Sequence, residues 1–312
     1  MQTMMKRLSR IRHVALDMDG TIYKGSTLFD FTQPFLALLG NLGIGHTFLT
    51  NNSSRSAKHY LSHLRKLGIF AEDDELYTST QATIEYLHER MPGVKRLFVL
   101  GTASMREEIA KAGFGLVENS VGGHDDLPRA EAGEPDAVVV GFDTALVYRR
   151  LCRAAYWIKR GKPFIATHPD RICPTDEPTV LVDCGSICAA LEKATGRAPD
   201  KVLGKPDPGM LRGILERHGL SPENLAMVGD RLYTDLAMAH QAGAFGVLVL
   251  TGETTAPEAD RHSPPPDLVV SGLAEFGQRL REARNPRTAK AGAGGTTTNP
   301  SPVAGPKSSI EK

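Results

Sequence analysis

Short apolar runs alternate along the chain with segments whose apolar residues recur at helical spacing. Residues 14–16 are an apolar run of the kind that forms a buried strand, and residues 44–49 are predicted to form a second strand. Residues 32–42 and 60–67 carry leucine and aromatic residues on one helical face, and a glycine follows each segment where a helix would end. This strand–helix–strand–helix order is typical of a parallel sheet with helices packed on it.

Expected strands and helices also alternate through residues 78–185, where they are shorter, and through residues 186–283, where they resemble those of the first part of the chain. The pattern alone leaves open whether 78–185 extends the same sheet or forms a separate α/β unit inserted into it. After about residue 284 the chain is rich in Gly, Ala, Thr, Ser and Pro. We expect residues 284–312 to be a disordered tail, because such a segment buries too little apolar surface to offset the entropy of ordering it.

The composition is that of a globular protein with a sizeable core. Hydrophobic residues make up 41% and charged residues 23% of the 312 residues. A net charge of +1 gives no bulk electrostatic reason to expect nucleic acid or an anionic membrane as a partner. No apolar run has the length of a membrane span. Four cysteines without CxxC spacing lead us to expect reduced thiols and a cytoplasmic location.

The first apolar run ends in Asp17-Met18-Asp19-Gly20-Thr21. In an open parallel sheet, ligands bind just beyond the carboxyl ends of the strands. Two carboxylates this close repel each other unless they share a cation, and oxygen ligands suit Mg²⁺. Taken alone, the motif is also an ordinary strand-to-turn junction, since Asp and Gly are common turn residues.

Further polar residues that could bind phosphate or a metal ion lie near other expected strands. They are Thr50, Asn51 and Asn52 after the second strand, Lys205 just before a helix, and Asp230 and Asp235 after the strand at residues 225–228. Each group alone has an ordinary explanation as a helix cap, a solvated lysine or a turn. Together with the two aspartates, they supply the groups that phosphoryl transfer from a monoester needs.

Each of these residues has a candidate role in such a reaction. Asp17 can be the nucleophile that forms an aspartyl-phosphate, and Asp19 the general acid and base. The Thr50 hydroxyl and the amides after it can hold phosphate oxygens. Lys205 can pair with the phosphate and orient Asp17. Asp230 can complete a Mg²⁺ site with Asp17, where the ion screens charge and acts as a template.

In order and context these motifs resemble the haloacid dehalogenase-like hydrolase superfamily. Its phosphatases carry DxDGT, a Thr or Ser after the second strand, a distant Lys and a GD or DD pair. The corresponding positions here are residues 17–21, Thr50, Lys205 and residues 229–235. The resemblance runs from about residue 12 to residue 283, and each motif falls in its expected strand-end context.

Residues 50–54, 166–170 and 204–206 are similar to one subclass, the 4-nitrophenylphosphatase-like, nucleotide and sugar-phosphate phosphatases. That subclass carries a large α/β cap inserted between its second and third motifs. The resemblance therefore implies a Rossmann-like parallel sheet with helices on both faces and a smaller inserted α/β cap. It assigns residues 1–77 and 186–283 to the core and residues 78–185 to the cap.

The resemblance also implies a ligand set and a reaction. Mg²⁺ would be held by Asp17, the backbone carbonyl of Asp19 and Asp230, with Asp235 further out. We expect a Mg²⁺-dependent phosphatase acting on a small phosphomonoester, such as a sugar phosphate or nucleotide, and a possible homodimer through the cap. The alternatives are a phosphotransferase using the same chemistry and a non-catalytic phosphate-binding protein, which the retained acids and Lys205 disfavour.

Substrate contacts are expected from the second motif and from the cap. Thr50, Asn51 and Asn52 are the predicted phosphate-binding residues. Related caps often read Thr-Asn-Pro-Asp where residues 167–170 read Thr-His-Pro-Asp. If His168 faces the cleft, it would meet a substrate hydroxyl or carboxylate; otherwise it is a loop histidine of no special role. Asp143, beyond the run at 137–140, is a weaker candidate of the same kind.

Overall fold

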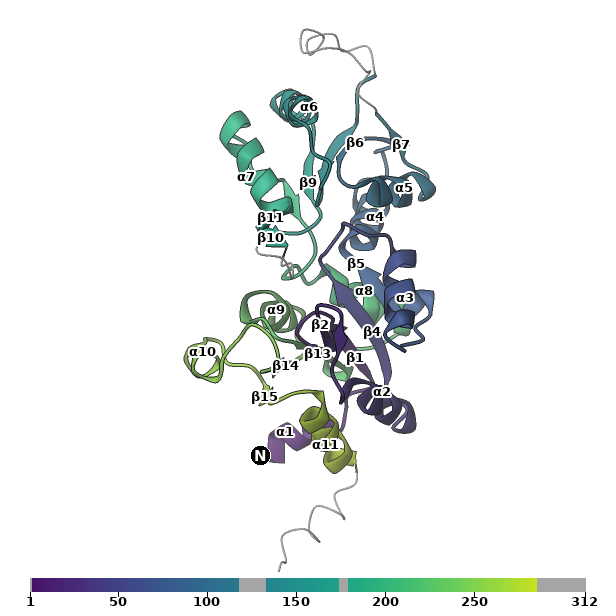
Figure 1. The fold of residues 1–312 in the computed structure, drawn as a ribbon, viewed down its shortest axis with the longest axis vertical. Helices are drawn as coiled ribbons and strands as arrows, with labels where there is room; N and C mark the ends of the chain where they lie inside the picture. The colour runs from purple at the N-terminus through teal and green to yellow at the C-terminus, as the bar shows by residue number, and fades with distance from the viewer. Residues whose placement is uncertain (1, 118–132, 174–178, 285–312) are drawn as a thin grey trace, which may run out of the picture.

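The computed structural model of the chain describes residues 2–117, 133–173 and 179–284, which form two α/β parts stacked along the long axis of the molecule (Figure 1). The larger part, the core, is built on a sheet of six strands. In spatial order they are β15 (Leu268–Val270), β14 (Phe245–Val249), β13 (Leu225–Gly229), β1 (His13–Asp17), β4 (Gly45–Thr50) and β5 (Leu76–Thr78). Every neighbouring pair is parallel.

Helices cover both faces of the core sheet, as the side chains of β1 require. Val14 and Leu16 pack with one helical layer and Ala15 packs with the other, because successive strand residues point to opposite faces. The first layer contains α1 (Gln2–Leu8), α2 (Thr32–Asn41), α3 (Ala57–Lys66) and α11 (Leu273–Arg284). The second contains α8 (Gly209–His218) and α9 (Ala237–Ala242), and α10 (Ala256–Arg261) packs near β14. The predicted fold class is confirmed.

The smaller part, the cap, is built on a second parallel sheet of five strands. In spatial order they are β12 (Lys201–Val202), β9 (Phe164–Ala166), β8 (Ala137–Val140), β6 (Arg96–Leu100) and β7 (Gly115–Leu116). One face packs on α4 (Ser79–Arg90) and α5 (Ala103–Lys111), the other on α6 (Tyr148–Lys159) and α7 (Cys184–Thr195). The remaining short elements are the pair β2 (Tyr23–Lys24) and β3 (Thr27–Leu28), the pair β10 (Ile172–Cys173) and β11 (Leu181–Val182), η1 (Asp73–Glu75), η3 (Pro222–Asn224) and the π-helical turn η4 (Leu232–Leu236).

The second boundary of the cap differs from the predicted one. The core was expected to resume at residue 186, but α7 buries Ile187 and Leu191 against the cap sheet, and β12 pairs with β9. The cap therefore continues through Val202, because the apolar face of α7 is complementary to the cap strands. The predicted tail, 284–312, lies outside the described residues except for Arg284, which ends α11.

The chain crosses between the two parts at two places. It leaves the core directly from β5 into α4, and it returns after β12 through Gly204 and Lys205. The helix α4 packs on both parts, with Ala82 in a core cluster and Leu87 in a cap cluster. Among the described residues, none of the helices combines the length and apolar character of a membrane span.

Candidate active site

Three strands of the core sheet bring polar residues to one edge. Asp17 is the last residue of β1, Thr50 is the last residue of β4, and Asp230 directly follows β13. Because these neighbouring strands are parallel, their carboxyl ends meet at the same edge. Carboxylate oxygens of Asp17, Asp230 and Asp235 lie within 4.8 Å of one another. The structure thus brings together acids that are more than two hundred positions apart in sequence.

Lys205 places a buried positive charge among these acids. Its ammonium forms an ion pair with Asp17 Oδ1 and lies 2.8 Å from Asp235 Oδ1. Burial alone would lower the pKa of the Lys205 ammonium, but the carboxylates of Asp17 and Asp235 outweigh it and raise the pKa above its ordinary value. Lys205 is therefore charged throughout the physiological range, and its charge is directed at the predicted nucleophile.

Asp230 is held by close approach of two glycines. A Cβ at Gly20, where φ is +86°, would lie 2.6 Å from Asp230 Oδ2, and a Cβ at Gly252 would lie 1.9 Å from the same atom. Only glycine allows the backbone to come this near. The Glu253 N–H donates to Asp230 Oδ2 at 2.6 Å, and Thr251 Oγ1 donates to the Gly20 carbonyl at 2.6 Å. The other oxygen, Asp230 Oδ1, is buried and has no hydrogen-bond partner among the described residues.

The site carries more negative than positive charge, which favours a bound cation. Burial and the neighbouring Asp17 raise the pKa of Asp230 to about 6. Burial also raises the pKa of Asp235, to about 7, although Lys205 opposes it. Asp235 is already engaged, since its Oδ2 accepts from the Arg231 N–H at 3.1 Å and its Oδ1 faces Lys205. Asp17 and the unpaired oxygen of Asp230 therefore fit a hard divalent cation best, with Asp235 further out.

The other predicted active-site residues flank this group. Asp19 is exposed, and its carboxylate accepts only the Gly25 N–H, at 3.1 Å, among the hydrogen bonds of the described residues. Thr50 is buried and its hydroxyl accepts the Asn52 N–H at 3.2 Å. Asp19 is thus free to exchange protons with a ligand, while Thr50 lies at the end of β4 beside Asp17.

Comparison with known proteins agrees with this geometry. A family model described as haloacid dehalogenase-like hydrolase matches residues 14–115, and a second, HAD-hydrolase-like, matches residues 202–276. An acid sugar phosphatase of Staphylococcus saprophyticus is 32% identical over 267 residues, covering 86% of this chain and 97% of that protein. The chain belongs to the haloacid dehalogenase-like hydrolase family. The predicted family and the prediction of a phosphoric monoester hydrolase are confirmed.

Solved structures of similar proteins extend the comparison to the whole fold of this hydrolase. A 4-nitrophenylphosphatase of Thermotoga maritima superposes with a TM-score of 0.78 and 40% identity, covering 87% of this chain and 98% of that one. A glycerol phosphate phosphatase of Mycobacterium tuberculosis in complex with magnesium superposes with a TM-score of 0.75 and 29% identity, covering 88% and 77%. The core and the cap of this hydrolase are thus arranged as in named phosphatases.

His168 does not face the cleft of the hydrolase, which corrects the expected substrate contact. Its side chain is 0% exposed, and its ring nitrogens lie 2.8 Å from Thr167 Oγ1 and 3.0 Å from Asp183 Oδ1. Burial would lower the pKa of His168, but Cys184 and Asp183 outweigh it and raise the pKa to about 9. Asp183 also accepts the Cys184 N–H at 2.6 Å. His168 therefore links the loop after β9 to Asp183 at the start of α7.

Asp143 and the two asparagines of the second motif are also engaged within the protein. Asp143 is buried and pairs with Arg150 at 2.9 Å. The Asn51 amide bonds the main chain of Lys205 rather than lying open to substrate. Asn52 Oδ1 accepts the Ser54 N–H at 2.9 Å. The side chains of Asn51, Asn52 and Asp143 thus have partners within the protein, and the phosphate contacts of the amides after Thr50 stay a prediction.

A group at the rim of the site was missed from the sequence. Glu253 pairs with Arg231 Nε at 2.9 Å and accepts the Tyr233 hydroxyl at 2.7 Å. Burial would lower the pKa of Arg231, but Asp17 and Asp230 raise it, so this guanidinium stays charged beside the acids. Its position in the sequence could have indicated a place at the site, because the polar segment around Glu253 follows β14 at the same edge of the core sheet.

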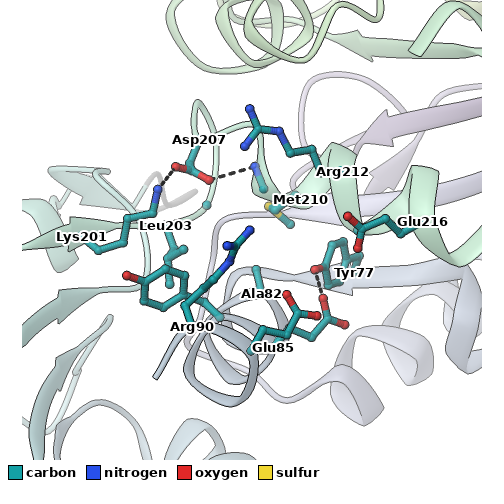
Figure 2. Close-up of a pocket in the computed structure, with 15 residues that line it drawn as sticks. Tyr77, Ala82, Glu85, Arg90, Lys201, Leu203, Asp207, Met210, Arg212 and Glu216 are labelled. Atoms are coloured by element: carbon teal, nitrogen blue, oxygen red, sulfur yellow. Dashed lines mark hydrogen bonds and ion pairs between the residues drawn. The ribbon is translucent and has the colours of Figure 1, made fainter. Parts of the chain in front are cut away.

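A separate cavity of about 380 Å³ lies between α4, α8 and β12 (Figure 2). Lys201 pairs with Asp207 on one wall, and the Tyr77 hydroxyl donates to Glu85 on another. None of the predicted site residues lines this cavity, although Gly204 does. The cavity therefore lies beside the returning crossing and is not the catalytic pocket.

The raised pKa of Asp230 predicts that cation binding weakens as the pH falls. Without a cation, the raised values of Asp230 and Asp235 mean that their contribution to folding stability is present below about pH 4 and is lost as the pH rises through about 6 to 7. A bound cation removes the need for these protons. We expect added Mg²⁺ to raise the Tm more at about pH 7.5 than at about pH 5. Thermal unfolding with and without MgCl₂ tests this, and Asp230→Asn should abolish the difference. An equal rise at both pH values would contradict it.

Proposed function

We propose that this protein is a Mg²⁺-dependent phosphatase that hydrolyses a small phosphomonoester through an aspartyl-phosphate on Asp17. The observation that carries the proposal is the convergence of Asp17, Asp230 and Lys205 on one buried site at the carboxyl ends of the core strands. The relatives support the substrate class, since they are named acid sugar phosphatase, 4-nitrophenylphosphatase and glycerol phosphate phosphatase.

The residues of the site divide the reaction between them. A carboxylate oxygen of Asp17 forms a bond to phosphorus as the phosphorus–oxygen bond of the ester breaks, and Asp19 gives its proton to the leaving alkoxide. Asp19 then takes a proton from water, whose oxygen attacks the phosphorus. Inorganic phosphate leaves and the Asp17 carboxylate is restored. Lys205 holds Asp17 in place and offsets the negative charge of the phosphoryl group.

The residues that would hold Mg²⁺ are Asp17 and Asp230, with the backbone carbonyl of Asp19 as a further ligand. When bound, the ion would screen the Asp17 carboxylate from the phosphate dianion. Excess negative charge and the unpaired oxygen of Asp230 both support this. The cap, connected by its two crossings, would close over the substrate and select the leaving group.

Metal removal is the first test of the proposed function. We expect phosphate release to stop when a chelator removes divalent ions, and to return when Mg²⁺ is added in excess. The assay is a phosphate-release screen over sugar phosphates, nucleotides, glycerol phosphates and pyridoxal phosphate. Adding glycerol as an acceptor separates hydrolysis from phosphotransfer, because a transferase would form glycerol phosphate. Activity that persists in chelator, or a failure to release phosphate from any of the esters, would refute the proposal.

A further inference from the structure

Asn51 holds both main-chain polar groups of Lys205. Its side-chain Oδ1 accepts the Lys205 N–H at 2.6 Å, and its Nδ2 donates to the Lys205 carbonyl at 3.0 Å. Asn51 is 6% exposed, so these bonds are largely shielded from water. The pair of bonds fixes the peptide groups on both sides of the Lys205 Cα. They therefore fix the point from which a long, flexible side chain reaches toward Asp17.

The same asparagine also reaches the cap and the outgoing crossing. Asn51 Nδ2 lies 3.3 Å from Asp170 Oδ1, on the cap loop after β9. The Asn51 carbonyl accepts the Ser79 hydroxyl at 2.5 Å, and Ser79 is the first residue of α4. One residue at the end of β4 thus contacts both crossings, at Ser79 and Lys205, and the cap loop between them.

Gly204 packs between Asn51 and this cap loop. A Cβ at Gly204, where φ is +67°, would lie 2.7 Å from Asn51 Oδ1, 2.8 Å from the Thr167 carbonyl and 2.9 Å from His168 Cβ. The returning crossing is therefore in tight contact with the core on one side and with the cap on the other. The cap loop itself is anchored, because the Asp170 carbonyl accepts the Gly185 N–H of α7 at 2.7 Å. A shift of the cap would therefore displace Gly204, which is the residue before Lys205.

We propose that Asn51 is a positioning residue that couples the location of the cap to the orientation of the Lys205 ammonium. The inference deepens the proposed phosphatase function and rests on it. With the cap seated, Asp170 and the two crossings hold Asn51, and Asn51 holds Lys205 between Asp17 and Asp235. When the cap moves away, these contacts loosen together. Charge compensation at the nucleophile is then complete only over an enclosed substrate.

A double-mutant cycle tests this coupling. Asn51→Ala should lower kcat by about tenfold to 100-fold with a smaller change in KM, because Lys205 loses its alignment while substrate contacts remain. Asp170→Ala should lower kcat less. The double variant should resemble Asn51→Ala alone, since both substitutions break one linkage. Asn51→Asp keeps an acceptor for the Lys205 N–H, but it loses the donor to the Lys205 carbonyl and to Asp170 and places a carboxylate beside Asp170, so it should lower kcat at least as much as Asn51→Ala.

The matched control is Asn224→Ala, at the opposite ends of the core strands. Asn224 Nδ2 donates to the Arg10 carbonyl at 3.0 Å, so the variant also loses an asparagine bond to main chain. It should lower the Tm and leave kcat unchanged. The proposal is overturned if Asn51→Ala keeps kcat within about twofold of wild type, or if the Asn51 and Asp170 effects simply add.

Hydrogen exchange gives a readout that does not depend on turnover. In Asp170→Ala, exchange in peptides that contain Lys205 should become faster, because losing the cap contact loosens the Asn51–Lys205 pair. Asn224→Ala should leave these peptides unchanged. If wild type hydrolyses no ester, the proposed function fails and this comparison still decides the coupling. Unaltered exchange in Asp170→Ala would show that Asn51 supports Lys205 independently of the cap.

Discussion

Replacing Asp17 by asparagine is expected to lower phosphate release by at least about 10⁴-fold, because an amide oxygen cannot serve as the nucleophile. The substitution keeps the size of the side chain, so the phosphate site and the cap should remain in place. A stopped phosphate-release assay against the best ester of the screen measures the loss. Hydrolysis at a rate comparable to wild type would refute the nucleophile assignment.

The same variant should remain folded. Asp17 contributes to the repulsion that raises the pKa of Asp230 and Asp235, so removing its charge relieves two neighbours while Lys205 keeps Asp235 as a partner. We therefore expect the Tm without Mg²⁺ to be unchanged or higher. Thermal unfolding of both proteins in chelator is the control. A sharp fall in Tm would mean that inactivity reports unfolding and not chemistry.

Replacing Lys205 by methionine is expected to affect both catalysis and stability. Turnover should fall by about 10³-fold, because the charge that faces the phosphoryl group and aligns Asp17 is lost. The buried carboxylates of Asp17 and Asp235 then lack their cation, which should cost about 3 kcal/mol or more at pH values where both are ionised. Phosphate release and urea unfolding measure the two effects.

The pH dependence of that stability loss gives a sharper test. Asp235, with a pKa near 7, is protonated at lower pH and then needs no partner, so Lys205→Met should be less destabilised at about pH 6 than at about pH 8. Lys205→Arg keeps the charge and should recover much of the stability, with less of the activity. Equal destabilisation of the methionine variant at both pH values would argue against the buried ion pair as its cause.

The place where the candidate site lies could be predicted from the sequence because strand ends carry local signals. Asp17, Thr50 and Asp230 each lie at the end of an expected strand, and a parallel sheet brings such ends together. Glu253 obeys the same rule after β14 but was missed, since its segment contains a single acid among Thr and Gly residues. Searching the ends of the expected strands therefore locates the candidate site, but it misses residues such as Glu253 that lie further along the loops around it.

Side-chain direction was harder to predict, because it depends on contacts between distant segments. The sequence left His168 open between a substrate contact and an ordinary loop position, and in the structure its ring contacts Asp183, fifteen positions later, inside the cap. Asn51 lies in the predicted phosphate-binding motif, and its side chain bonds the main chain of Lys205, 154 positions away. From residue type alone, an asparagine or histidine side chain could form hydrogen bonds of similar strength with several different groups. Only the packed structure selects among them.

The place of β12 on the cap sheet has a consequence for protein engineering. A chimera that joined the cap of one such enzyme to the core of another at residue 186 would cut α7 in its first turn, and it would take the rest of α7 and all of β12 from the core donor. The strand β12 of one enzyme would then have to pair with β9 of the other, and α7 would have to pack on a foreign cap sheet. Transplanting residues 79–202 as one piece keeps the sheet whole. Exchange of substrate preference between homologues is best attempted with those end points.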